Sequence, residues 1–344
     1  MRHIRLHIQQ RRTLISVAAV SVVALGLAAC SAPADGGDGG AEKTLQVAYL
    51  SFAVANTYDT PMLAAAQAVA DANNVELTVF DANNDPTAQA AQFQDAIASG
   101  QYDGIITQPI YGPALLDATA AAIAAGIKVV NIDQILGSDF TTGDVQVDGL
   151  SANVSQRPSD MGTKLGQQTV AACASQALDP CKVAYIYDIK ASALDVAIRD
   201  AWDAAVAGSP VKVIAEGESF FNPANALTVV QDMLTANTDL QLIVGSDQGL
   251  QGADQAIEAA GKTGKLLLVG FGGSEVGISA VADGRWFADV MMVPASEGRL
   301  GMEAMVDALR NGNDQGAVDP FADLPNEGVV TAETASEFTG EWPG

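Results

Sequence analysis

The feature that most constrains the fold of this 344-residue chain is an internal repeat. The segment 75–108 is similar to the segment 211–245, and an offset of 137 positions aligns Pro86 with Pro223 and one Gln-Asp pair with another. Both copies continue through a helical stretch to Ala-Ala-Gly and then to a further hydrophobic run. Such self-similarity indicates a structural unit that is used twice. The sequence therefore predicts two similar lobes.

Each lobe is predicted to have an α/β architecture. Short β-branched or leucine-rich runs alternate with alanine-rich stretches, which is typical of a doubly wound parallel sheet with helices on both faces. Asp85-Pro86 and Asn222-Pro223 predict helix starts, because each places an N-cap side chain before a proline of the first turn. The expected strands are 45–50, 76–80, 104–107, 127–132, 183–187, 211–215, 240–244, 265–269 and 287–291.

The beginning of the chain indicates a secreted protein. Basic residues precede an uncharged run from Thr13 to Ala29, as in a signal peptide. The run ends in Leu-Ala-Ala-Cys30, which is similar to the lipobox of bacterial lipoproteins. We expect residues 1–29 to be a lipoprotein signal peptide, Cys30 to be the lipidated residue and 30–43 to be a flexible tether. A plain cysteine in a single-pass anchor is the alternative.

Charge and histidine content exclude several functions. The net charge of −24 opposes binding to phosphate backbones, so no nucleic-acid partner is expected. The two histidines, His3 and His7, would leave with the signal peptide, which excludes a Ser-His-Asp arrangement and a histidine-ligated zinc site. Asp81-x-Asn83-x-Asp85 begins like a calcium loop, but proline stands where that loop requires glycine. We therefore expect no metal and no cofactor.

Two cysteines remain in the predicted mature chain. Cys173 and Cys181 enclose seven residues, and outside the cytoplasm such a pair favours a local disulfide. Two free buried thiols are the alternative.

The repeat also locates a binding crevice. Val129–Asp133 in the first copy aligns with Leu268–Gly272 in the second, so one strand ends in a carboxylate and its counterpart ends in glycine. Ligands of open parallel sheets bind beyond the carboxyl ends of the strands. Both ends should therefore face a shared crevice.

At this point the chain resembles the type I periplasmic solute-binding proteins, in particular the ribose-binding-like sugar receptors of ABC importers. The resemblance extends from Leu45 to about Gly312 and is carried by Asn56-Thr-Tyr-Asp59, Val79-Phe-Asp-Ala-Asn-Asn-Asp-Pro86, Val129-Val-Asn-Ile-Asp133, Gly245-Ser-Asp247, Val269-Gly-Phe-Gly272 and Asp283-Gly284. It implies two doubly wound lobes joined by a hinge of three crossings, with one solute held between them. We expect an N-terminal lobe of 44–147 plus 293–323 and a C-terminal lobe of 148–292 plus 324–344.

The resemblance also implies the ligand-binding residues: Asn56, Tyr58, Asp59, Asp133, Gln134, Phe221, Ser246, Asp247, Gly272 and Met292. Carboxylates and amides would pair with hydroxyls, and aromatic rings would cover the C–H side of a sugar. The sugar receptors usually carry arginine at the position of Gln134, aspartate at Gly272 and a polar residue at Met292. Glycine and methionine at these positions would leave a gap, so we expect a larger or less polar solute than a simple aldose. Ser51 and Phe52 are weaker candidates.

Several residues have a structural alternative. Asp133 and Asp247 each close a hydrophobic strand and could be helix N-caps instead of ligands. Tyr58 could belong to the core. We expect Trp202 and Trp286 to pack in the core and not in the cleft.

The expected function is that of a lipid-tethered receptor outside the cell, which captures a small neutral, polyol-like solute by closing around it and passes it to an ABC permease. We expect a monomer that contacts the membrane through its lipid anchor only. A ligand-binding subunit of an extracytoplasmic sensor system is the alternative. A hydrolase that uses Asp59 and Asp133 is a third possibility, but the missing histidines and the resemblance favour a protein that is not an enzyme.

Overall fold

The computed structural model describes residues 43–344, which fold into two lobes, each built on a six-stranded sheet. The signal peptide, Cys30 and all of the tether except Lys43 lie outside the described residues. Within residues 43–344, no helix is both long enough and apolar enough to cross a membrane.

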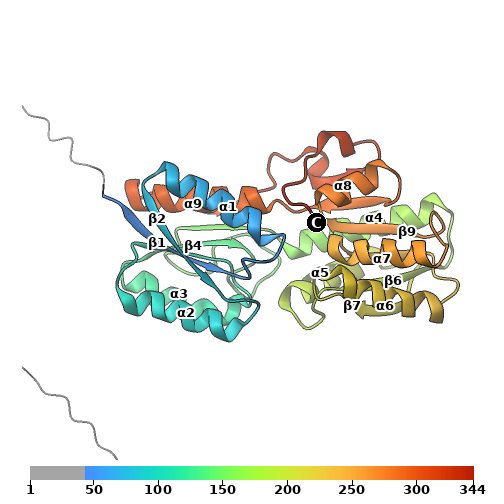
Figure 1. The fold of residues 1–344 in the computed structure, drawn as a ribbon, viewed down its shortest axis with the longest axis horizontal. Helices are drawn as coiled ribbons and strands as arrows, with labels where there is room; N and C mark the ends of the chain where they lie inside the picture. The colour runs from blue at the N-terminus through green and yellow to red at the C-terminus, as the bar shows by residue number, and fades with distance from the viewer. Residues whose placement is uncertain (1–42) are drawn as a thin grey trace, which may run out of the picture. The chain divides into compact units, whose positions relative to one another are not determined.

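The N-terminal lobe contains sheet A, whose strand order is β11-β5-β4-β3-β1-β2. Its pairs are all parallel. Helices α1 and α9 cover one face of this sheet, and α2 and α3 cover the other (Figure 1). The elements are β1 (Leu45–Ser51), α1 (Asp59–Ala72), β2 (Val75–Asp81), α2 (Pro86–Ser99), β3 (Gly104–Thr107), α3 (Gly112–Ala124), β4 (Lys128–Asp133), β5 (Ala152–Ser155), α9 (Pro294–Asn311) and β11 (Gly316–Val318).

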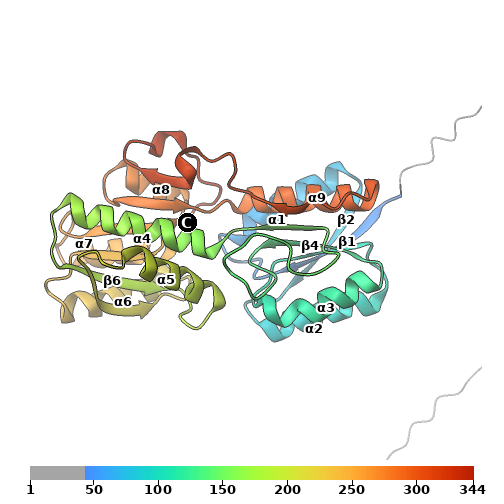
Figure 2. The same ribbon diagram turned by 180° about the vertical axis from the view of Figure 1, so that it is seen from behind.

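The C-terminal lobe contains sheet B, whose order is β12-β10-β9-β8-β6-β7. Helices α4 and α5 pack on one face and α6 and α7 on the other (Figure 2). The elements are α4 (Pro158–Ser175), β6 (Cys181–Tyr187), α5 (Ala193–Val206), β7 (Val211–Glu218), α6 (Pro223–Ala236), β8 (Leu242–Ser246), α7 (Asp247–Ala259), β9 (Leu267–Gly272), α8 (Glu275–Ala282), β10 (Ala288–Met291), β12 (Val329–Thr331) and the 3₁₀ turns η1 (Pro325–Gly328) and η2 (Ala335–Glu337).

The internal repeat corresponds to a repeated topology. The order β2-β1-β3-β4-β5 in sheet A matches β7-β6-β8-β9-β10 in sheet B. The aligned helix starts are also equivalent, since the side chains of Asp85 and Asn222 each accept hydrogen bonds from two backbone N–H groups of the first turn. The prediction of two similar doubly wound lobes is confirmed.

Nine strands were expected and all nine are present; 104–107 has the expected ends, and the other eight differ at one or both ends. Three short strands, β5, β11 and β12, were not expected. Because β5 pairs with β4, the start of the C-terminal lobe at residue 148 is wrong. The chain first leaves sheet A after Ser155. The other lobe boundaries stay predictions.

Sheet B also differs from the expected parallel arrangement, because β12 pairs antiparallel with β10.

Successive side chains of a strand face the helices on opposite sides of the sheet. In β1, Val47 and Tyr49 face α1 and α9, whereas Ala48 and Leu50 face α2 and α3. Residues one apart in a strand point to opposite faces, so a strand buried on both sides reads as a continuous apolar run. This is why the expected strands could be found as uninterrupted hydrophobic segments.

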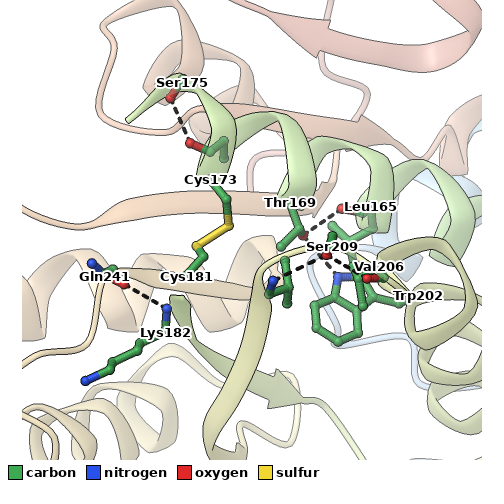
Figure 3. Close-up of a disulfide and its surroundings, with 12 residues drawn as sticks. Leu165, Thr169, Cys173, Ser175, Cys181, Lys182, Trp202, Val206, Ser209 and Gln241 are labelled. Atoms are coloured by element: carbon green, nitrogen blue, oxygen red, sulfur yellow. Dashed lines mark hydrogen bonds between the residues drawn. A yellow bond between two sulfur atoms is a disulfide. The ribbon is translucent and has the colours of Figure 1, made fainter. Parts of the chain in front are cut away.

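A disulfide joins Cys173, near the end of α4, to Cys181, the first residue of β6 (Figure 3). The two Cα atoms are 5.8 Å apart and both side chains are buried. Nearby, Trp202 Nε1 donates to Thr169 Oγ1 at 3.0 Å, so the buried indole has a polar partner. The structure therefore contains the disulfide and not the pair of free thiols.

Replacing both Cys173 and Cys181 by serine should lower the free energy of unfolding by about 2–3 kcal/mol, because the unfolded chain regains the freedom of the short loop. Urea unfolding of the oxidised wild type and of the double variant measures the difference. Reduced wild-type protein is the control and should match the variant. Equal urea midpoints for oxidised wild type and variant would contradict the prediction.

Candidate functional site

A pocket, with about 530 Å³ of empty space when the open solvent at its mouth is included, lies at the carboxyl ends of strands from both sheets. The N-terminal lobe contributes mainly polar side chains, and the C-terminal lobe contributes mainly apolar ones. The lining residues are Phe52, Asn56, Tyr58, Asp59, Gln108, Asp133 and Gln134 from the first lobe, Leu194, Phe221, Ser246, Gln248, Phe271, Gly272 and Met292 from the second, and Trp342 near the C-terminus. Strands of a parallel sheet present their carboxyl ends at the same edge, which explains how distant segments meet here.

Nine of the ten sequence-predicted residues line this pocket. The exception is Asp247. Their role in binding a solute stays a prediction, but their convergence in one pocket is a structural fact.

Asp133 ends β4 and is buried, with a positive φ of 64° that aspartate tolerates better than most residues. Its carboxylate accepts hydrogen bonds from Gln108 Nε2 at 3.1 Å and from Gln156 Nε2 at 3.2 Å. The chain continues to β5 and not to a helix, so Asp133 is not an N-cap. Asp133 instead lines the pocket.

Gln108 connects two carboxyl groups. Its Nε2 donates to Asp59 Oδ1 at 2.5 Å and to Asp133 Oδ2 at 3.1 Å, while its Oε1 accepts from Phe52 N at 3.0 Å. All polar groups of this buried amide are therefore used, which fixes its orientation. Sequence analysis missed Gln108, although it directly follows β3 and the strand-end rule that located Asp133 would have found it.

Tyr58 connects the pocket to α9. Its hydroxyl donates to Glu297 Oε2 at 3.2 Å and lies 3.5 Å from Asp133 Oδ1. The tyrosine ring meets the ring of Trp342 edge to face, with centroids 5.4 Å apart. Tyr58 is partly buried and also contacts the cores of both lobes. It therefore both lines the pocket and packs against the core, so neither expectation excludes the other.

Burial controls the ionisation of these carboxyl groups. Desolvation raises the pKa of Asp133 to about 6 and that of Asp59 to about 8, although hydrogen bonds from Gln108 act in the opposite direction. Burial, followed by the charge of Asp133, raises the pKa of Glu297 well above its usual range. No lysine or arginine is among the described residues that line the pocket. Near neutral pH, the pocket therefore offers one ionised carboxylate, Asp133, and one protonated acid, Asp59.

In the second lobe, Ser246 is the N-cap of α7 and accepts from Gly249 N at 3.2 Å. Its hydroxyl donates to the buried Asp188 at 2.7 Å, which is a contact that the sequence did not predict. Ser246 lines the pocket, but its hydroxyl already makes one donor and one acceptor interaction inside the protein.

Asp247 holds the loop that follows β9. Its Oδ2 accepts from Ser274 N at 2.7 Å, and Asp289 Oδ2 accepts from Gly273 N at 3.1 Å. Asp247 is fully buried and does not line the pocket, and it is the first residue of α7 rather than its N-cap. The N-cap alternative for Asp247 is therefore wrong, and its contact with a solute stays a prediction that the lining of this pocket does not support.

The role assigned to Gly272 also needs correction. A Cβ at this position would lie 2.5 Å from Asp247 Cγ, and φ is +148°. Glycine is therefore required by the neighbouring carboxylate and the backbone, and it does not leave a gap for solute bulk. The Gly272 carbonyl is also occupied, because it accepts from Trp342 Nε1 at 2.7 Å and Met292 N at 3.3 Å.

Apolar side chains complete the second wall. Phe221 follows Phe220 in a loop where both residues have positive φ, an uncommon conformation for bulky side chains. Phe221 lines the pocket and Phe220 is exposed. Sequence analysis missed the other apolar contributors and Gln248; the additional lining residues are Leu194, Gln248, Phe271 and Trp342.

Trp342 had no sequence signal, because it follows the last predicted element and lies outside the repeat. The other two tryptophans lie as expected in the core, with Trp202 and Trp286 almost fully buried.

Known proteins share this architecture. The ribose import binding protein of Salmonella typhimurium is 29% identical over 246 residues, which cover 71% of this chain and 78% of that protein. A xylitol-binding protein of Mycolicibacterium smegmatis is 27% identical over 314 residues, covering 90% and 84%. An ABC transporter solute binding protein from Mycobacterium smegmatis, solved with bound glycerol, superposes with a TM-score of 0.73 at 26% identity and covers 88% of this chain and 100% of that one.

The family model described as periplasmic binding protein domain matches residues 47–314. This span contains all or most of every strand except β11 and β12, and most of the pocket. This span and the two-lobed fold place the chain in the periplasmic binding protein family, with the type I architecture of the sugar-binding receptors of ABC importers.

Proposed function

We propose that the pocket captures a small neutral sugar-like or polyol-like solute and that the protein delivers it to an ABC permease. The observation that carries this proposal is the pocket itself, in which carboxyl and amide groups of one lobe face apolar and aromatic side chains of the other. Relatives named for ribose import and xylitol binding support the same solute class, and the import function in the first name favours an importer over a sensor subunit.

The polar wall suits a hydroxylated solute. Asp133 can accept from a hydroxyl, and the protonated Asp59 can donate to one. Asn56 and Gln134 add amide groups that can do both. A buried hydroxyl left without a partner costs about 1–3 kcal/mol, so alternating donors and acceptors discriminate among stereoisomers.

Closure of the two lobes would follow from the division of the pocket between them. A solute that contacts groups on both lobes binds the closed form more tightly and therefore increases its population. The expected hinge includes the segment between β10 and α9, where Met292 lines the pocket. Outside the described residues, lipidation of Cys30 would keep the receptor at the extracytoplasmic face of the membrane, next to its permease.

Asp133→Ala should weaken solute binding by about ten- to a hundredfold, because it removes the ionised acceptor of the pocket. Thermal shift against xylitol, myo-inositol, glycerol, ribose and allose would first identify a bound solute, and calorimetry would compare affinities. With Gln134 and Met292 in place of arginine and a polar side chain, we expect the aldoses to give the smallest shifts.

The matched control for this variant is Asp232→Ala, which removes an exposed carboxylate of α6. Its affinity should equal that of the wild type. Unchanged affinity in Asp133→Ala would contradict the assignment of the pocket, and turnover of a glycoside by the wild type would contradict the binding function.

The raised pKa of Asp59 predicts a pH-dependent stability. The folded protein binds this proton up to about pH 8, whereas the unfolded chain releases it near pH 4. The contribution of Asp59 to stability is therefore fully present below pH 4 and is lost as the pH rises toward 8. Asp59→Asn keeps the shape of the protonated acid but cannot ionise. Its free energy of unfolding should therefore rise relative to wild type by up to about 1 kcal/mol per pH unit in this window.

Urea unfolding of both proteins at pH 5, 6, 7 and 8 measures this difference, since the contributions of the other groups largely cancel. Parallel curves for wild type and Asp59→Asn would show that Asp59 is ionised in the folded protein.

A further inference from the structure

The last residues of the chain return to the pocket. We call residues 338–344 the C-terminal tail. Its end lies beside α8 (Figures 1 and 2), and a Cβ on Gly340 would lie 2.5 Å from Glu275 N. Glu275 N donates to Trp342 O at 2.9 Å, and Val276 N donates to Pro343 O at 3.4 Å. The tail thus satisfies two N–H groups of the first turn of α8 that have no partner inside the helix.

The tail also contacts the N-terminal lobe. Glu341 accepts hydrogen bonds from Ser296 N at 2.8 Å and from Ser296 Oγ at 2.5 Å. Ser296 lies in the first turn of α9, directly after the β10–α9 segment that connects the lobes. A carboxylate at a helix N-terminus is stabilised by the unpaired N–H groups and the helix dipole.

Trp342 contacts both lobes with one side chain. Its Nε1 donates to the Gly272 carbonyl at the end of β9, and its ring meets that of Tyr58, which immediately precedes α1. The residue is only 3% exposed, yet it lines the pocket. This indole therefore forms part of the pocket wall where residues of the two lobes meet.

We propose that Trp342 is a specificity-determining residue, against which the apolar C–H side of the solute packs, and that the C-terminal tail holds it in place. This inference rests on the proposed function of the pocket. Aromatic rings provide large, rigid contact areas for C–H groups. The hydrogen bond to Gly272 and the edge-to-face contact with Tyr58 fix the orientation of the indole before a solute arrives, so little ordering is needed on binding.

Tryptophan fluorescence provides a direct test. The chain has three tryptophans, and Trp342 is the one that lines the pocket, whereas Trp202 and Trp286 are core residues of the C-terminal lobe. A solute identified in the thermal-shift panel, with xylitol as the first probe, should change the emission of the wild type. Trp342→Phe should abolish this change and weaken binding at least tenfold by calorimetry. Trp286→Phe is the control and should retain both the change and the affinity.

A second variant tests the inference even if Trp342→Phe does not fold. Glu341→Gln leaves the indole unchanged but removes the charge that binds Ser296, and it should weaken binding by about two- to fivefold. A solute that binds wild type and Trp342→Phe equally, with no change in wild-type emission, would overturn this inference and leave the proposed function intact. Failure of every solute in the panel to bind the wild type would overturn both.

Discussion

The burial of carboxyl groups at the carboxyl edge of sheet A is the constraint on which the pocket depends. Asp59 and Asp133 come from different elements, and within residues 43–344 no lysine or arginine lines the pocket to neutralise them by an ion pair. The amide of Gln108 donates to both, and desolvation keeps Asp59 protonated near neutral pH. Proton uptake replaces the salt bridge that a buried carboxylate would otherwise require. The result is a wall with both donors and acceptors.

The second lobe uses its buried carboxylates differently. Asp247 and Asp289 accept from successive backbone N–H groups, those of Ser274 and Gly273, and so hold the loop after β9. Burial raises the pKa of both, and the charge of Asp247 raises that of Asp289 further. The two lobes share a topology, but buried acidic residues line the pocket in one lobe and bind backbone N–H groups in the other. The duplicated fold therefore produces an asymmetric pocket.

The sequence was sufficient to predict two similar doubly wound lobes, nine of the twelve strands of residues 43–344 and most of the pocket. Repeated helix starts such as Asp85-Pro86 and Asn222-Pro223 are local signals, and the strand-end rule located Asp133 from one strand alone. The direction of a buried side chain is not a local property. Asp247 follows a strand just as a ligand residue would, but the proximity of the β9 loop turns it inward. The same contact explains Gly272. Its missing side chain was expected to leave space for the solute, but the Asp247 carboxyl group occupies that space.

Trp342 lies beyond what the repeat can predict. A duplicated unit specifies those parts of the pocket that occur in both copies, and the C-terminal tail occurs once. Its position depends on backbone groups at the start of α8 and on Ser296 in α9, and hydrogen bonds of this kind leave no pattern in the sequence. The tail joins elements of the two lobes close to the segment that connects them. A single-copy segment that contacts both lobes can therefore influence how they close on a solute, whereas the repeated units specify only the walls that each lobe contributes.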